Sequence, residues 1–142
     1  DRGPIVAAAH AALVEAGFAD RIEAWAGDVA DHPGLAADLV LVSNVCHAYR
    51  PEVAERLVCD AALLLRPGGT IAIRDLRVDR TGAGPRVGAD YALGMALFAS
   101  EGGIHPTPRV REWLEAANLG RIEELETRGD PGCYLIVAQA RS

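Results

Sequence analysis

Lysine is absent from the 142 residues, and all 14 basic residues are arginines. The sequence therefore contains no Schiff-base lysine and no phosphate-binding P-loop lysine. Basic charge is also scarce overall, because 20 acidic residues leave a formal net charge of -6 at pH 7. Nucleic-acid binding depends on clustered positive charge, so we expect no nucleic-acid partner.

Cysteines and long apolar runs are few as well. Cys46, Cys59 and Cys133 show no CxxC spacing, so neither a disulfide framework nor a zinc site is predicted. No apolar stretch approaches the roughly 18 residues that cross a bilayer, and no charged-then-apolar leader opens the chain. We expect a soluble, cytoplasmic protein with no membrane partner. Its 50% hydrophobic content suffices for one core, which favours a single domain.

Hydrophobic periodicity and turn residues predict alternating helices and strands. We expect helices over residues 4–16, 51–64, 91–98 and 107–117, with Thr107 as an N-cap and Pro67–Gly69 ending the second helix. We expect strands over residues 21–26, 39–42, 70–73, 122–127 and 133–138. The branched run Leu39–Val42 is typical of a strand buried on both faces. This order predicts an α/β open sheet with an antiparallel C-terminal edge.

Polar side chains follow the expected parallel strands, at the edge where ligands bind in such sheets. Asp28 comes after a tight glycine turn, where it could contact a sugar or adenine, or simply lie in a solvated loop. His47 is a candidate general base or a structural histidine. Asp75 could orient His47 or merely end a strand, and His105 could belong to a lid or to a plain connection.

The helix expected at residues 91–98 is apolar around its whole circumference. Its large side chains are Tyr91, Leu93, Met95, Leu97 and Phe98. Such a helix must be covered, either by packing on protein or by forming one wall of an apolar ligand pocket.

These segments, in this order, resemble the small-molecule O-methyltransferase family, which includes the plant caffeate and bacterial polyketide-tailoring enzymes. The resemblance runs nearly end to end. It is carried by Ala26–Asp28, Asp38–His47, Leu65–Thr70, and Glu101–Gly103 followed by the helix at Thr107.

The resemblance implies a class I methyltransferase, Rossmann-like open sheet, of which residues 1–142 form an N-terminally incomplete, S-adenosylmethionine-binding part. It implies methyl transfer to an oxygen of a small acceptor in secondary metabolism, and a homodimer formed through a region outside this sequence. By resemblance, Asp1 binds the cofactor ribose, Asp28 reaches adenine and Val29 packs on the adenine ring. Ser43, at the end of a strand, is a further candidate for cofactor contact.

The same resemblance makes His47 the general base of the reaction. Two acidic residues usually flank that histidine; Asp75 stands where the first is expected, and His105 takes the place of the second. The family's usual aspartate after the base is Ala48 here.

Two other functions remain open at this point. A truncated or degenerate methyltransferase-like subunit without catalysis would explain Ala48, His105 and the lack of a glycine-rich cofactor loop, and would show no cofactor affinity. A nicotinamide-dependent oxidoreductase shares the open α/β architecture, but a Tyr-x-x-x-Lys pair cannot exist without lysine. Calorimetry with NAD and S-adenosylmethionine side by side distinguishes these functions.

Overall fold

The computed structural model describes residues 3–31, 35–98, 102–127, 129–130 and 132–141. The chain forms two compact units, Asp1–Pro33 and Gly34–Ser142. Among the described residues, the first unit contains one α-helix and a short 3₁₀ turn, Val29–Asp31, and the second contains a sheet with its covering helices.

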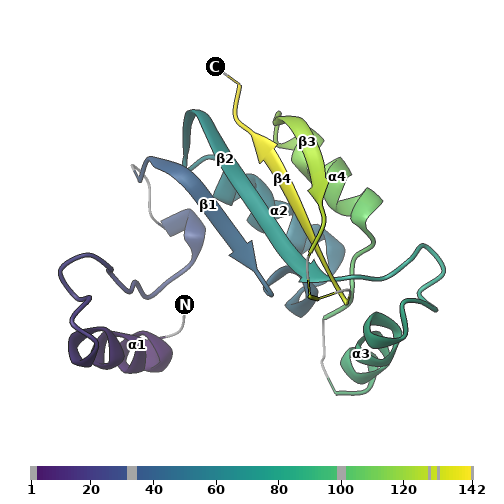
Figure 1. The fold of residues 1–142 in the computed structure, drawn as a ribbon, viewed down its shortest axis with the longest axis horizontal. Helices are drawn as coiled ribbons and strands as arrows, with labels where there is room; N and C mark the ends of the chain where they lie inside the picture. The colour runs from purple at the N-terminus through teal and green to yellow at the C-terminus, as the bar shows by residue number, and fades with distance from the viewer. Residues whose placement is uncertain (1–2, 32–34, 99–101, 128, 131, 142) are drawn as a thin grey trace. The chain divides into compact units, whose positions relative to one another are not determined.

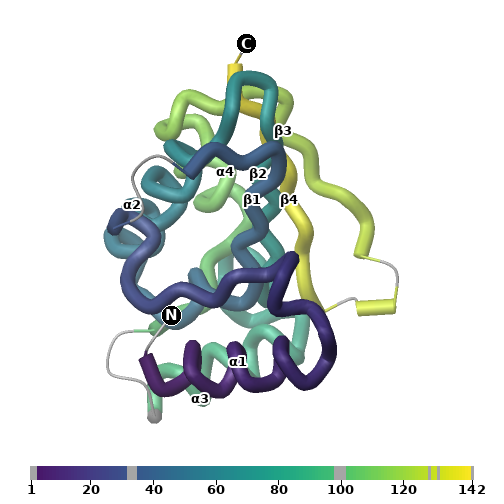
Figure 2. The backbone as a smooth tube through the Cα atoms, turned by 90° about the vertical axis from the view of Figure 1, so that its left-hand side faces the viewer, coloured from purple at the N-terminus to yellow at the C-terminus, as the bar shows by residue number. Residues whose placement is uncertain are grey.

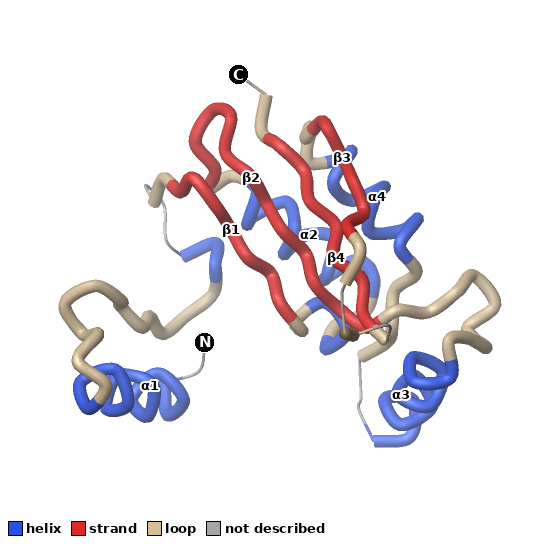
Figure 3. Tube along the Cα trace, in the orientation of Figure 1, coloured by secondary structure: helices blue, strands red, loops and turns tan. Residues whose placement is uncertain are grey.

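The helix of the first unit is α1, Gly3–Glu15. Gly17 follows it in a left-handed conformation (φ 73°), a common helix stop, so the predicted helix is confirmed. The strand predicted over residues 21–26 is wrong, because these residues form turn and loop (Figure 3). They make no β-ladder with any described strand, and an isolated strand lacks the partners that its backbone groups need.

The second unit contains a four-stranded open sheet in the order β1-β2-β4-β3 (Figure 1). Strand β1 (Ala37–Ser43) runs parallel to β2 (Leu65–Leu76). Strand β4 (Cys133–Gln139) pairs antiparallel with both β2 and β3 (Gly120–Leu125). The predicted parallel strands with an antiparallel C-terminal hairpin are therefore confirmed. Because Ser43 pairs with Arg74, β1 and β2 end side by side.

Helices α2 (Pro51–Ala62) and α4 (Thr107–Ala116) cover the same face of this sheet (Figure 2). Helix α2 contacts β1 and β2, whereas α4 contacts β3 and β4. The largest side chains of the core between helices and sheet are all but inaccessible to solvent: Val58, Ile71, Ile73, Val110, Trp113, Leu114, Tyr134 and Ile136. This apolar layer fixes the sheet as a rigid floor for the loops at its end.

Strand β1 is not buried on both faces, contrary to the prediction. Val42 is buried under α2, but Leu39 and Leu41 are 61% and 63% exposed. Successive side chains of a strand point to opposite faces, and no described helix of the second unit covers the face that carries the two leucines. Sequence alone cannot separate this case from a fully covered strand.

Two predicted boundaries are also wrong. Pro106, extended at φ -63° and ψ 145°, is the N-cap of α4, and Thr107 is already helical. The proline ring supplies the extended conformation of an N-cap without a side-chain hydrogen bond. Pro67–Gly69 lie inside β2 rather than at the end of α2, which stops at Ala62.

The predicted apolar helix is confirmed as α3, Arg86–Phe98, which lies beyond the carboxyl end of β2 (Figure 1). Its surface is less covered than expected, since Leu93 and Leu97 are exposed. The side chain of Phe98 lies outside the described residues.

Candidate active site

The turn after β1 carries the first group of the site. Beyond Ser43 the chain passes through Asn44, whose left-handed backbone (φ 54°) is one that asparagine tolerates better than most residues. The Asn44 N–H donates to the Arg74 carbonyl at 2.9 Å, which ties this turn to β2. A short 3₁₀ turn, Cys46–Ala48, follows and presents His47 at the carboxyl edge of the sheet.

The structure brings His47 and Asp75 together. His47 Nδ1 lies 2.6 Å from Asp75 Oδ1, and the His47 backbone N–H donates to Asp75 Oδ2 at 3.1 Å. The Leu76 N–H also donates to Oδ1, at 2.8 Å. Asp75 is only 2% exposed, so a carboxylate with three donors is held in place in a nearly dry environment.

This geometry determines which nitrogen of His47 can react. An ionised carboxylate only accepts hydrogen bonds, so the proton shared with Asp75 belongs on Nδ1. The lone pair of neutral His47 is then on Nε2, where it can take a proton from a bound hydroxyl group. The His47 side chain remains 14% exposed, which leaves the ring partly accessible.

Buried Cys46 sits next to His47 but is unsuited to nucleophilic chemistry. Burial, and to a smaller extent the charge of Asp75, raise the pKa of the Cys46 thiol to about 12. Since the thiolate is the reactive form, this cysteine stays an inert packing group at neutral pH.

His105 is placed behind the turn that carries His47. It is buried, and its Nε2 lies 3.1 Å from the carbonyl oxygens of both Cys46 and Tyr49. Its ring meets Trp113 edge to face, with centroids 4.9 Å apart. Burial lowers the pKa of His105, so the neutral ring donates from Nε2 to these carbonyls. His105 thus stabilises the 46–49 turn through two of its backbone carbonyl groups.

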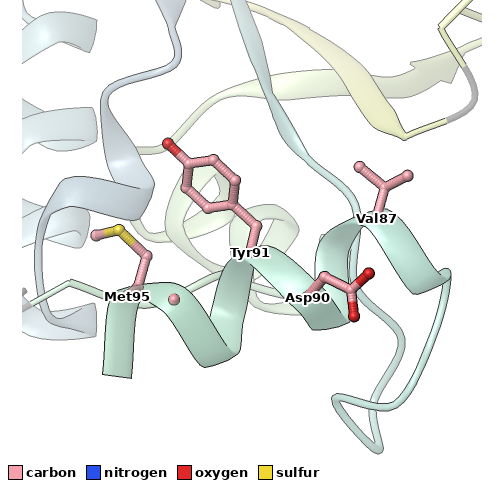
Figure 4. Close-up of a pocket in the computed structure, with 5 residues that line it drawn as sticks. Val87, Asp90, Tyr91 and Met95 are labelled. Atoms are coloured by element: carbon pink, nitrogen blue, oxygen red, sulfur yellow. The ribbon is translucent and has the colours of Figure 1, made fainter. Parts of the chain in front are cut away.

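An open cavity of about 540 Å³ lies along α3, lined by Val87, Asp90, Tyr91, Gly94 and Met95. Val87, Tyr91 and Met95 project from the same side of the helix (Figure 4). They are four residues apart in sequence, which is the spacing of one helical face. Tyr91 and Met95 were predicted for such a wall. Val87, Asp90 and Gly94 were missed, although Val87 lies four residues before Tyr91, and Asp90 and Gly94 lie on neighbouring turns of the same helix.

Tyr91 also connects the cavity with His47. The two ring centroids are 5.5 Å apart, with an angle of 81° between the ring planes. Tyr91 thus lines the cavity and contacts the imidazole, which is not itself part of the cavity wall.

Three candidate cofactor residues fall in the described part of the chain, and Asp1 lies outside it. Asp28 is exposed and follows Gly27, whose φ of 126° favours glycine. Its Oδ1 accepts from the Ala30 N–H at 3.5 Å. Val29 is half-buried beside it in the first unit, and half-buried Ser43 ends β1 in the second. Within the first unit, an exposed carboxylate and an apolar side chain suit the amino group and the ring of an adenosine.

Among the described residues, no group of three or more metal-ligating side chains could hold a metal ion. None of the described helices is long and apolar enough to cross a membrane.

Residues 1–117 match the family model of the O-methyltransferase domain, and the chain belongs to this family. An O-methyltransferase family protein from Burkholderia thailandensis is 25% identical, with a TM-score of 0.89 over 100% of this chain and 42% of that one. A family 2 O-methyltransferase from Planctomyces limnophilus, solved in complex with apigenin, is 29% identical, with a TM-score of 0.84 over 98% of this chain and 41% of that one.

Human N-acetylserotonin methyltransferase, solved with S-adenosylmethionine, shares the fold at 23% identity. Its TM-score is 0.74, over 87% of this chain and 35% of that one. A search of curated proteins finds no match. The chain spans about two fifths of the length of the two bacterial relatives.

Proposed function

We propose that the full-length protein transfers a methyl group from S-adenosylmethionine to an oxygen of a small acceptor, which is aromatic or polyketide-like. The observation that carries this proposal is the 2.6 Å contact between His47 and Asp75, with Tyr91 of the α3 cavity wall in ring contact with the imidazole. Membership of the O-methyltransferase family supports the reaction class and argues against nicotinamide chemistry.

Asp1, Asp28 and Val29 would contact the adenosine part of the cofactor. Ser43, in the second unit, is proposed separately as a cofactor contact. The human relative solved with S-adenosylmethionine supports this choice of cofactor. When bound, S-adenosylmethionine would supply an electrophilic methyl group for the acceptor oxygen, with S-adenosylhomocysteine as the second product.

The residues of this chain handle the proton of the acceptor. His47 takes the proton of the acceptor hydroxyl on Nε2 as the oxygen becomes nucleophilic. Asp75 holds Nδ1–H at 2.6 Å, which fixes the ring orientation and stabilises the imidazolium that forms. His105 acts indirectly, because it binds the carbonyl groups of the turn that carries His47. Proton transfer by a positioned side chain contributes about 10²–10⁴-fold to a rate.

The acceptor is proposed from the cavity wall. Val87, Tyr91 and Met95 present apolar and aromatic surface, which suits a planar aromatic or polyketide ring better than a sugar. The Planctomyces limnophilus relative was solved with apigenin, an aromatic compound, which supports this choice. A smaller apolar residue at Met95 should change the preference among acceptors and leave cofactor affinity nearly constant.

The experiment compares His47→Ala with His10→Ala in the full-length protein, because His10 is an exposed histidine on α1. Formation of S-adenosylhomocysteine is measured with apigenin and simple catechols as acceptors, and cofactor binding by calorimetry. We expect His47→Ala to lose at least about 100-fold in turnover with little change in cofactor affinity. Unchanged turnover would remove His47 from the mechanism.

The degenerate-subunit alternative is tested by the same calorimetry. It predicts that the unsubstituted full-length protein binds no S-adenosylmethionine. The intact His47–Asp75 pair favours the enzyme, since a non-catalytic subunit has no need for a buried carboxylate aligned on an accessible imidazole.

A further inference from the structure

Tyr134 on β4 is a buried tyrosine that the mechanism above does not use. The residue is 0% exposed, and its hydroxyl oxygen Oη is closed off from solvent. Among the residues that the structure describes, no protein group makes a hydrogen bond with this oxygen. A hydroxyl buried without a partner costs free energy, and in native proteins such groups are usually satisfied, often by an ordered water. The Tyr134 hydroxyl therefore needs a partner.

The register of the sheet places Tyr134 directly opposite Asp75. The two residues are partners in the antiparallel pairing of β2 with β4 (Figure 1). Side chains opposite one another in such a ladder project from the same face, with Cβ atoms about 4.5–5.5 Å apart. Asp75 follows the core residue Ile73 by two positions, so both partners lie on the face that the helices cover. Tyr134 thus shares a buried layer with the carboxylate that orients His47.

The Asp75 carboxylate can accept one more hydrogen bond. Its Oδ1 accepts from His47 Nδ1–H and from the Leu76 N–H. Among the described groups, its Oδ2 accepts only from the His47 N–H. Each oxygen of a carboxylate can accept about two hydrogen bonds, so Oδ2 has room for a fourth donor. In a nearly dry environment such a donor strengthens the hold on a charged oxygen.

Electrostatics join Tyr134, Asp75 and Cys46 into one buried polar cluster. Burial, and after it the charges of Asp75 and Cys46, raise the pKa of the Tyr134 phenol well above its usual range. Burial and the charge of Asp75 likewise raise the pKa of the Cys46 thiol. Both groups therefore keep their protons at neutral pH and can act as donors. A cluster of three polar groups suits one buried water, which typically makes about three hydrogen bonds.

We propose that Tyr134 is a positioning residue for the His47–Asp75 pair: one buried water accepts a hydrogen bond from the Tyr134 hydroxyl and donates one to Asp75 Oδ2. This inference rests on the proposed function of His47. The fourth hydrogen bond holds the carboxylate more firmly against Nδ1–H, so the imidazole keeps Nε2 directed at the acceptor. Because Tyr134 is buried and acts through Asp75, its loss should lower kcat and leave the KM for the acceptor unchanged.

The first test is kinetic and uses the full-length protein. Tyr134→Phe removes only the hydroxyl oxygen and keeps the ring that packs in the core. With S-adenosylmethionine and apigenin, we expect kcat to fall about three- to tenfold, which is the effect of one lost hydrogen bond. The KM for apigenin and the affinity for S-adenosylmethionine should change less than about twofold.

Ile136→Val is the matched control for a merely structural effect. Ile136 is 1% exposed and lies two residues from Tyr134 on the same face of β4. Removing one methyl group there disturbs the same core layer and no polar group. Ile136→Val should therefore lower the urea midpoint and leave kcat unchanged.

Stability provides a second readout, in which the two states of the hydroxyl differ in sign. Removal of a buried hydroxyl that has no partner would raise the urea midpoint, because the folded state loses an unsatisfied group. Removal of a hydroxyl that is bonded through water to a carboxylate would lower it. We expect Tyr134→Phe to unfold at a lower urea midpoint than the unsubstituted protein.

A high-resolution crystal structure of the unsubstituted full-length protein tests the contact without any variant. It should show a water within hydrogen-bonding distance of both Tyr134 Oη and Asp75 Oδ2. A Tyr134 hydroxyl that bonds neither to water nor to Asp75 would overturn the proposal. Full kcat in Tyr134→Phe would do the same, and so would an equal loss of kcat in Ile136→Val.

Failure of the proposed function is a separate result, namely full turnover in His47→Ala. The crystal structure and the urea midpoint do not depend on turnover, so the two failures can be told apart.

Discussion

Gly88 lets α3 pack directly on the backbone that follows β2. A Cβ at this position would lie 1.8 Å from the Arg77 carbonyl oxygen and 2.9 Å from its carbonyl carbon. Gly94 on the same helix would meet nothing within 4 Å. The same substitution, glycine to alanine, can therefore be made at a crowded position and at an open position of one helix.

The expected magnitudes follow from two terms. Alanine in a helix interior is favoured over glycine by about 0.5–1 kcal/mol, so Gly94→Ala should stabilise the protein by that amount. In Gly88→Ala the same gain in helix propensity is opposed by an overpacking cost of about 1–3 kcal/mol. We expect a cost in the upper part of this range, because the new Cβ would clash with a backbone carbonyl that cannot rotate away. The two variants should differ in unfolding free energy by about 2–3 kcal/mol.

Urea unfolding of the full-length variants, monitored by circular dichroism, measures this difference. A shift of the urea midpoint with an unchanged m-value reports the change in unfolding free energy. Gly94→Ala should raise the midpoint and Gly88→Ala should lower it. Displacement of α3 in Gly88→Ala should also weaken the contact of Tyr91 with His47. If Gly88→Ala unfolds at or above the midpoint of the unsubstituted protein, α3 does not pack on the Arg77 carbonyl as described.

Three further predictions concern the core and the titratable groups. Trp113→Ala should cost about 3–5 kcal/mol in urea unfolding, because Trp113 is fully buried between α4 and the sheet, and a loss below 1 kcal/mol would contradict this packing. Burial lowers the pKa of His105 in the folded state, so the unfolded state binds the proton more tightly. The contribution of His105 is complete above its ordinary pKa of about 6.5 and lost as pH falls from there to the folded value, so the unfolding midpoint should fall between pH 7.5 and 5. His105→Asn should flatten this dependence, and an equal slope would refute the assignment. Finally, Cys46 and Cys133 are buried and Cys59 is partly exposed, so Cys59 should be the first of these three thiols to react with an aromatic disulfide reagent. The reaction should still be slow at neutral pH, because partial burial and the charges of Glu55 and Asp60 raise the pKa of Cys59. Cys59→Ser should remove it, and an equally fast reaction of Cys46 or Cys133 would show that the core is open.

Local patterns in the sequence were enough to predict most elements. Helical spacing from Pro51 and Thr107 predicted α2 and α4, and the turn Gly129–Gly132 predicted the β3–β4 hairpin, because these signals act over a few residues. The strand expected at 21–26 failed for the opposite reason. A strand is stable only with a neighbour, and its own residues cannot say whether one is present.

The sequence by itself placed His47 and Asp75 at the ends of two strands and Tyr91 on an apolar helix, because strand ends and helix faces can be recognised from local residue patterns. Only the tertiary structure decided that His47 meets Asp75 at 2.6 Å, since that contact depends on the parallel register of β1 and β2. It also turned His105 toward backbone carbonyls and brought Tyr91 to His47. These contacts join residues 28 to 59 positions apart, and their geometry follows from how the sheet and helices pack, which no local pattern encodes.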